Sequence, residues 1–83
     1  MKIEFSKHAR ERIKTRRISK NRVVKTIQNS AKILQSFRFR KLFQKNYGDK
    51  MLEVVTKIEN RKIIVITAYY LRNKNENKIR QKN

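Results

Sequence analysis

The sequence predicts an α+β domain in which a short N-terminal strand and a helical hairpin precede a three-stranded antiparallel meander, with the helices packed on one sheet face. Two observations support this expectation. Apolar residues recur at helical spacing in the first third of the chain, and they alternate at strand spacing, between turn signals, over much of the rest. At 83 residues the chain has room for one modest core. We therefore expect a single domain over residues 1–72 and a basic flexible tail over 73–83.

The first two elements are predicted from spacing and capping. Residues 2–5 alternate polar and apolar side chains, as a short strand would. Ser6 suits an N-cap, and Ala9 and Ile13 then recur at helical spacing, so a helix should follow and end near residue 16 or 17. This helix places Ala9 and Ile13 towards a core.

A second helix should run from a cap at Ser19 to about Asn29, because its apolar residues gather on one side. The link between the two helices is brief, so they should form a hairpin. Such a hairpin must cover a flat apolar surface, which only the remainder of the chain can supply.

The remainder of the chain predicts the meander. A long alternation over residues 32–46 is typical of a strand, and Gly48 lies in a turn signal that follows it. Residues 52–58 alternate again, and the almost wholly apolar run over 62–71 is typical of a central strand. Three antiparallel strands result.

The net charge of +18 is the strongest feature of the composition, with 24 Lys and Arg against 6 Asp and Glu. Most of the surplus lies in residues 1–45. Such a field attracts phosphate backbones through a sequence-independent contribution that weakens with salt. A nucleic acid is therefore the main expected partner, although an acidic protein or an anionic membrane surface would be drawn by the same charge.

The residue types also bear on cofactors, cellular location and membrane association. The chain has no cysteine, and no cluster of acidic residues and histidine indicates a magnesium or zinc site. We therefore expect no cofactor and a cytoplasmic location. No stretch approaches the roughly 20 apolar residues needed to span a bilayer, and no signal peptide is evident, so we expect no membrane association.

Three short motifs carry a resemblance to a known family. They are Phe5-Ser6-Lys7-His8-Ala9-Arg10-Glu11-Arg12, then Arg16-Arg17-Ile18-Ser19, and near the end Val65-Ile66-Thr67-Ala68-Tyr69. The pattern is similar to a family of small domains with a His-Ala-x-x-Arg motif on the first helix, grouped with the RelE/ParE superfamily of toxins. The resemblance covers residues 3 to about 72 and departs at Arg17, where a glycine is frequent.

The resemblance implies a RelE-like fold and a metal-independent endoribonuclease of a toxin-antitoxin pair. Such an enzyme cuts messenger RNA, often on the ribosome, and an acidic antitoxin protein neutralises it. RNA supplies its own 2′-hydroxyl nucleophile, so the protein needs a base, cationic donors for the phosphorane and an acid.

The candidate catalytic residues are His8, Arg12, Arg40, Tyr69 and Arg72. His8 would act as base or acid, the three arginines would hold the phosphate, and Tyr69 would donate to the leaving group or stack on a base. Further nucleic-acid contacts are expected from Lys7, Arg10, Lys14, Arg16, Arg17, Arg38, Lys41 and Lys57.

Structural roles are open for the same residues. His8 could pack against the sheet edge while Arg12 bonds a backbone carbonyl, so that both fix the helical hairpin. The phenylalanines at 37, 39 and 43 are expected in the core or against a partner, with stacking on exposed bases as the alternative. Tyr69 and Tyr70 must point to opposite faces of their strand, and register decides which one belongs to a site.

Two main functional hypotheses follow. The first is the toxin-like ribonuclease, with its substrate over the sheet face opposite the helices. The second is a non-catalytic RNA- or DNA-binding module of the same fold. A third is a toxin of the superfamily with another target, since some members inhibit a topoisomerase. The sequence does not specify an oligomeric state.

Overall fold

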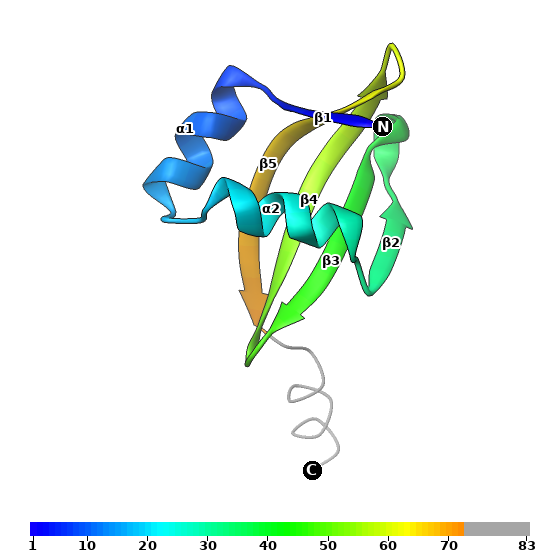
Figure 1. Ribbon diagram of the computed structural model, residues 1–83. Helices are drawn as coiled ribbons and strands as arrows, with labels where there is room; N and C mark the ends of the chain where they lie inside the picture. Colours follow the sequence, from blue (N-terminus) through cyan, green and yellow to red (C-terminus); the bar gives the residue numbers. More distant parts are fainter. Residues whose placement is uncertain (73–83) are drawn as a thin grey trace.

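The computed structural model describes residues 1–72, which form one sheet with two helices against it (Figure 1). The elements follow in the order β1 (Lys2–Phe5), α1 (Lys7–Thr15), α2 (Lys20–Gln28), β2 (Lys32–Gln35), the 3-10 turn η1 (Phe37–Phe39), β3 (Lys41–Tyr47), β4 (Lys50–Glu59) and β5 (Lys62–Arg72). The predicted tail over 73–83 lies outside the described residues.

The sheet has five strands in the order β1-β5-β4-β3-β2, so the predicted three-stranded antiparallel meander is wrong. Strands β3, β4 and β5 do pair antiparallel in succession, but β2 extends them at one edge and β1 at the other. β1 runs parallel to β5, from Lys2 opposite Lys62 to Phe5 opposite Val65, and this pairing makes the sheet mixed. The architecture remains α+β.

The extra strand β2 arises because the alternation over 32–46 folds as a hairpin and not as one strand. At its turn the N–H of Ser36 donates to the Arg40 carbonyl at 2.8 Å. Arg38 and Phe39 adopt left-handed φ values of 59° and 62°. No glycine or proline marks this turn, and the alternation continues on both sides of it, so periodicity alone does not locate the break.

Both helices begin at the predicted caps. The Ser6 hydroxyl accepts the N–H of Ala9 at 3.0 Å, and the Ser19 hydroxyl accepts the N–H of Arg22 at 3.0 Å. α2 crosses in front of the sheet over β3 and β4, and α1 lies at the left-hand edge beside β5 (Figure 1). Within residues 1–72, neither nine-residue helix is long and apolar enough to cross a membrane.

The core lies between the helices and one face of the sheet. Its buried apolar residues are Ala9, Ile13, Ile18, Val23, Ile27, Phe43, Leu52, Val54, Val65 and Ala68. They come from both helices, from Ile18 in the link between them and from the three central strands, so each helix depends on the sheet for the burial of its apolar stripe. In the described part of the chain, no helix covers the opposite face, which we call the open face.

A bulge in β5 decides which of its residues face the helices. The register of β5 against β4 shifts between Val55 and Thr56, which leaves Ile66 as an extra residue of β5. Val65 and Ala68, three residues apart, are therefore both fully buried in the core. A regular strand would place them on opposite faces, so the bulge reverses the facing of the second half of β5.

Candidate nucleic-acid interface

α1 presents a row of polar side chains beside its buried stripe. Ala9 and Ile13 face the core, and the exposed residues His8, Arg12 and Arg16 follow one another at intervals of four. We call His8, Arg12 and Arg16 the α1 row. Arg12 Nε donates a hydrogen bond to His8 Nε2 at 3.1 Å. Arg12 thus binds the ring nitrogen that serves as acceptor in a neutral imidazole.

Arg16 ties the end of the α1 row to the edge of β5. Its Nη1 donates to Thr67 Oγ1 at 3.1 Å and to the Ala68 carbonyl at 2.9 Å. Its guanidinium carbon lies 5.9 Å from the centre of the Tyr69 ring. β1 pairs with β5 only as far as Val65, so Arg16 supplies a donor to a carbonyl on the following stretch of edge. The same contacts bring the α1 row next to Tyr69.

Tyr69 lies on the open face, where a buried carboxyl group holds it. Its hydroxyl donates to Glu53, and the side-chain amide of Gln44 donates to the other carboxyl oxygen of Glu53. Gln44 and Glu53 are only 8% and 7% exposed. Burial, with the hydrogen bond to Glu53, raises the pKa of Tyr69 to about 12. Because Glu53 engages the hydroxyl proton, the ring of Tyr69 is the part free to meet a ligand.

The structure does not bring the other two candidate arginines to the α1 row. Arg40 directly precedes β3, whereas Arg72 ends β5 opposite Lys50, which follows the far end of β3. Arg72 therefore lies four residues beyond Ala68, to which Arg16 bonds, or about 13 Å along β5 at about 3.3 Å per residue, and the start of β3 is two strand spacings, about 10 Å, from β5. Of the five residues predicted as catalytic, the α1 row holds two and adjoins a third, while Arg40 and Arg72 lie elsewhere.

The eight cations predicted to contact nucleic acid do not form one surface. Exposed on α1 and just after it are Lys7, Arg10, Lys14, Arg16 and Arg17; Arg38 is exposed on η1; Lys41 and Lys57 are half-buried on β3 and β4. Arg10 is partly used within the protein, because its Nη1 donates to the Phe5 carbonyl at 2.9 Å.

Few of the positive charges are neutralised within the described residues. Residues 1–72 contain two ion pairs, Lys57 with Glu59 at 3.8 Å and Lys62 with Glu4 at 3.2 Å. Both pairs are partly exposed and contribute little to stability. In the same part of the chain no group of three or more His, Cys, Asp or Glu is arranged to hold a metal ion. Because so few of its cations are paired, the accessible surface of residues 1–72 is strongly positive.

A second cluster of basic and aromatic residues, around Arg22 on α2, was not predicted. Arg22 Nη1 donates to the Tyr70 hydroxyl at 2.9 Å, and its guanidinium carbon lies 4.5 Å from the centre of the Tyr47 ring. The Tyr47 hydroxyl also shares a hydrogen bond of 3.1 Å with Thr26. The hydrogen bond to Tyr70 raises the pKa of Arg22 above its ordinary value. These contacts join α2 to the ends of β3 and β5.

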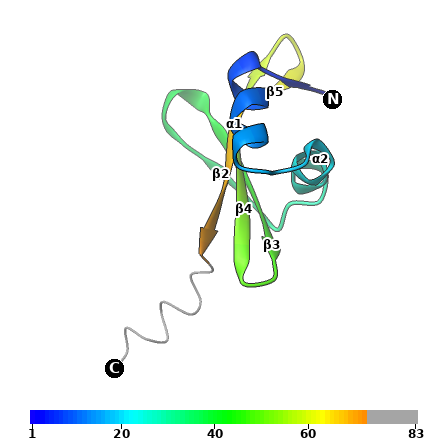
Figure 2. The ribbon, with the colours of Figure 1, turned by 90° about the vertical axis from the view of Figure 1, so that its left-hand side faces the viewer.

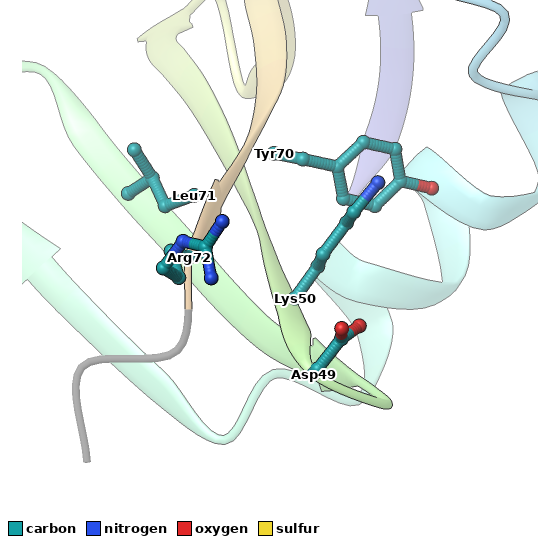
Figure 3. Close-up of a pocket in the computed structure, with 5 residues that line it drawn as sticks. All are labelled: Asp49, Lys50, Tyr70, Leu71 and Arg72. Atoms are coloured by element: carbon teal, nitrogen blue, oxygen red, sulfur yellow. The ribbon is translucent and has the colours of Figure 1, made fainter. Parts of the chain in front are cut away.

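A pocket of about 270 Å³ opens beside this cluster, lined by Asp49, Lys50, Tyr70, Leu71 and Arg72. Lys50 Nζ lies 5.7 Å from the centre of the Tyr70 ring, and Figure 3 shows the lysine extending towards that ring, with Leu71 turned away from it. The sequence pattern marks Arg22 only as a residue on the polar side of a helix. The one available signal was the expectation that Tyr69 and Tyr70 face opposite ways, which the register of β4 and β5 confirms.

The fold and the site together define a small, strongly basic α+β domain that carries a histidine and arginine row along its first helix. Residues 5–70 match the family described as a domain of unknown function, DUF4258, and the chain belongs to that family. The matched segment includes the α1 row, the bulge in β5 and both of its tyrosines. No curated protein and no solved structure matches the chain.

Proposed function

We propose that the protein binds RNA over the α1 row and cleaves it without a metal ion. The observation that carries this proposal is the contact between Arg12 Nε and His8 Nε2 on the exposed side of α1. It joins a proton acceptor to a phosphate-binding group on one surface, in a chain of net charge +18. Both side chains are exposed, so an RNA backbone can reach them without any change in the core.

The proposed reaction uses the nucleophile that RNA carries. His8 Nε2 accepts the proton of the 2′-hydroxyl, whose oxygen attacks the adjacent phosphorus. Arg12 leaves His8 and turns to the phosphate, because a guanidinium can bind two phosphate oxygens at once. The bond from phosphorus to the 5′-oxygen then breaks, and that oxygen takes a proton from a water molecule. The hydroxide left behind takes the proton from His8, which restores the base. The products are a 2′,3′-cyclic phosphate and a 5′-hydroxyl end.

The other predicted residues take supporting roles in this proposal. Tyr69 stacks its ring on a base, since its hydroxyl donates to Glu53. Arg40 and Arg72 contact nucleotides that flank the scissile phosphate, because Arg40 precedes β3, Arg72 ends β5, and neither takes part in the hydrogen bonds of the α1 row.

A non-catalytic RNA- or DNA-binding module of the same fold is the alternative. It is favoured by the contacts of Arg16 and Tyr69, because Arg16 bonds the backbone of β5 and Tyr69 donates to Glu53. If these contacts persist in the complex, neither group can assist the leaving oxygen. His8 and Arg12 would then bind phosphate and stabilise α1 only.

We further propose a cellular role as the toxin of a toxin-antitoxin pair, acting in the cytoplasm on messenger RNA, as the resemblance to the RelE/ParE superfamily implies. An acidic antitoxin would cover the α1 row and offset the surplus of positive charge. A neighbouring gene for a short acidic protein, with rescue of growth on its co-expression, would support this role. Growth arrest without loss of RNA would point instead to another target.

RNA cleavage in the presence of EDTA tests the proposed reaction. Wild-type protein should cut labelled RNA, and His8→Ala should slow cleavage by about 100-fold or more, the usual effect of losing an acid-base group. Arg12→Ala should also slow cleavage and weaken binding. Lys25→Ala removes an exposed charge from α2, outside the α1 row, and should cleave like the wild type.

Two controls make the result decisive. RNA with a single 2′-deoxy nucleotide at the cleaved position should resist cleavage there, since it lacks the nucleophile. Thermal unfolding should show that the variants are folded. Unchanged cleavage by His8→Ala would refute the assignment of His8, and binding without cleavage by every version would establish the alternative.

A further inference from the structure

The tip of the β2–β3 hairpin, residues 36–40, exposes two aromatic rings. Phe37 and Phe39 are 88% and 85% exposed, which makes them the most exposed large apolar side chains among the described residues. Neither packs on the core, although the helix-covered face of the sheet buries Phe43 only a few residues away. Full exposure of two large rings is unfavourable for a free domain and is typical of a surface that binds something.

The backbone of this hairpin tip holds the rings outwards. Arg38 and Phe39 both adopt left-handed φ values, of 59° and 62°, which residues with a side chain adopt only rarely. The turn is closed by backbone hydrogen bonds from Ser36 to the Arg40 carbonyl at 2.8 Å and from Arg40 to the Phe37 carbonyl at 3.2 Å. The exposure is therefore a property of a closed turn that continues directly into paired strands.

Each ring is followed in the chain by a guanidinium group, in the order Phe37-Arg38-Phe39-Arg40, and Lys41 comes next. A single-stranded nucleic acid likewise alternates a flat base with a charged phosphate. We propose that the hairpin tip is a second RNA-binding element, in which Phe37 and Phe39 stack on unpaired bases and the adjoining cations contact phosphates. This inference rests on the proposed RNA-binding function and adds that the RNA is single-stranded where it meets the tip.

Charge and the shape of the turn argue against a second copy of this chain and against a lipid surface as the occupant of the tip. A second copy of this chain would bring the same cations against Arg38 and Arg40, and a net charge of +18 on each copy opposes such a contact. A lipid surface is usually bound by a longer amphipathic helix, whereas here two rings are separated by an arginine in a three-residue turn.

The tip and the α1 row lie at different edges of the sheet, so one RNA must cross the sheet to reach both. β5, beside α1, is separated from β2 by three strand spacings, about 14 Å at about 4.8 Å each. In Figure 2 the hairpin tip curves away from α2, towards the open face. A strand of RNA passing over the open face, where Tyr69 lies, would therefore join the two elements.

Binding of labelled single-stranded RNA, measured by fluorescence anisotropy with uncleavable 2′-deoxy or 2′-methoxy oligonucleotides, tests the inference. Phe37→Ala and Phe39→Ala should each weaken binding about tenfold, within the range for loss of one base–aromatic stack. The dependence of affinity on salt should not change, because no charge is removed. Ile58→Ala, which truncates another exposed apolar side chain at 43% exposure, should bind like the wild type.

The outcome is decided by comparing the wild type with the double variant on normal RNA, on abasic RNA and on anionic phospholipid vesicles. An abasic oligonucleotide of equal length should bind the wild type and the double Phe37→Ala, Phe39→Ala variant equally, since it offers no base to stack on. The inference is overturned if the double variant binds normal RNA as tightly as the wild type does, or if its affinity for abasic RNA falls as much as its affinity for normal RNA. It is also overturned if the double variant loses affinity only for anionic phospholipid vesicles. If RNA affinity depends on Arg12 but not on Phe37 or Phe39, the role of the tip is refuted and the proposed function is not. If the wild type does not bind RNA, the proposed function is refuted too.

Discussion

Tyr69 and Tyr70 are neighbours in the chain but have different partners. Tyr69 donates to Glu53 on the open face, and Tyr70 accepts a hydrogen bond from Arg22 under α2. Successive residues of a strand face opposite sides, and the extra residue Ile66 in the bulge decides which tyrosine faces the helices, because without it the second half of β5 would present its opposite face to them. One inserted residue thus decides which aromatic ring lies next to the α1 row.

The environment of Tyr69 leads to a prediction about pH. Its pKa should be about 12 and not the ordinary 10.0, because burial and the bond to Glu53 favour the protonated hydroxyl. The folded state therefore holds this proton more tightly than the unfolded chain. The resulting stabilisation should be fully present below pH 10 and should be lost as the pH rises from 10 to about 12. Tyrosinate absorbance of the wild type minus that of Tyr69→Phe measures the titration.

Two variants separate the causes of this shift. Glu53→Gln removes the carboxylate but keeps the size of the side chain, so the pKa of Tyr69 should move back towards 10.0. Tyr70→Phe removes a hydroxyl from the other face and should leave the titration of Tyr69 unchanged. A folded wild type in which Tyr69 titrates at its ordinary value would contradict the arrangement described for the open face.

At the scale of an element, α1 ends in a turn that normally favours glycine. Arg17 has a left-handed φ of 58°. Its N–H donates to the Lys14 carbonyl at 3.1 Å, and the N–H of Ile18 donates to the Ile13 carbonyl at 2.8 Å, the two bonds of a Schellman motif. Ile13 and Ile18 are both buried in the core. The burial of these isoleucines offsets the unfavourable backbone of Arg17, so the helix ends here without a glycine.

Glycine at this position should stabilise the protein. Arg17→Gly should be more stable than Arg17→Ala by about 1 kcal/mol, because only glycine adopts a left-handed φ without steric cost. Both variants lose the same charge, so their difference isolates the backbone contribution. The difference corresponds to roughly 4–8 °C in the unfolding midpoint for a domain of this size, and calorimetry would measure it. Equal midpoints would mean that the turn relaxes away from the left-handed conformation.

At the scale of the whole molecule, like charges repel one another and oppose folding. Residues 1–72 hold 20 Lys and Arg against 5 Asp and Glu, and only two ion pairs form among them. The compact state brings these cations closer together than the unfolded chain does, so the repulsion falls mainly on the folded protein. The same charges provide the attraction for a polyanion, and binding one would relieve the repulsion.

This balance predicts opposite effects of salt on stability and on binding. Raising the ionic strength from about 0.01 M to about 0.15 M shortens the Debye length from about 30 Å to about 8 Å. The unfolding midpoint should therefore rise, while the affinity for RNA should fall. Thermal unfolding and anisotropy over the same salt series measure the two effects. A double variant with Lys14→Gln and Lys25→Gln should show a smaller rise, and a midpoint that falls with salt would contradict the prediction.

The helices and the α1 row could be predicted from the sequence because their signals are local. Ser6 and Ser19 cap the helices through bonds that span three residues, and the buried stripe of α1 follows a spacing of four. His8 and Arg12 are four apart on one helix, so their contact also follows from sequence spacing. The role of these two residues in RNA cleavage stays a prediction, as does the resemblance to the RelE/ParE superfamily.

Only the tertiary structure decided how the strands pair and which groups meet across them. Alternation reports which side chains share a face, but it carries no information about the neighbouring strand. It therefore revealed neither the parallel pairing of β1 with β5 nor the hairpin turn that separates β2 from β3. The bulge at Ile66 and the bond between Arg22 and Tyr70 likewise depend on residues far apart in the chain. Short-range spacing is determined by the covalent chain, whereas register is determined by the packing of the whole sheet against its helices.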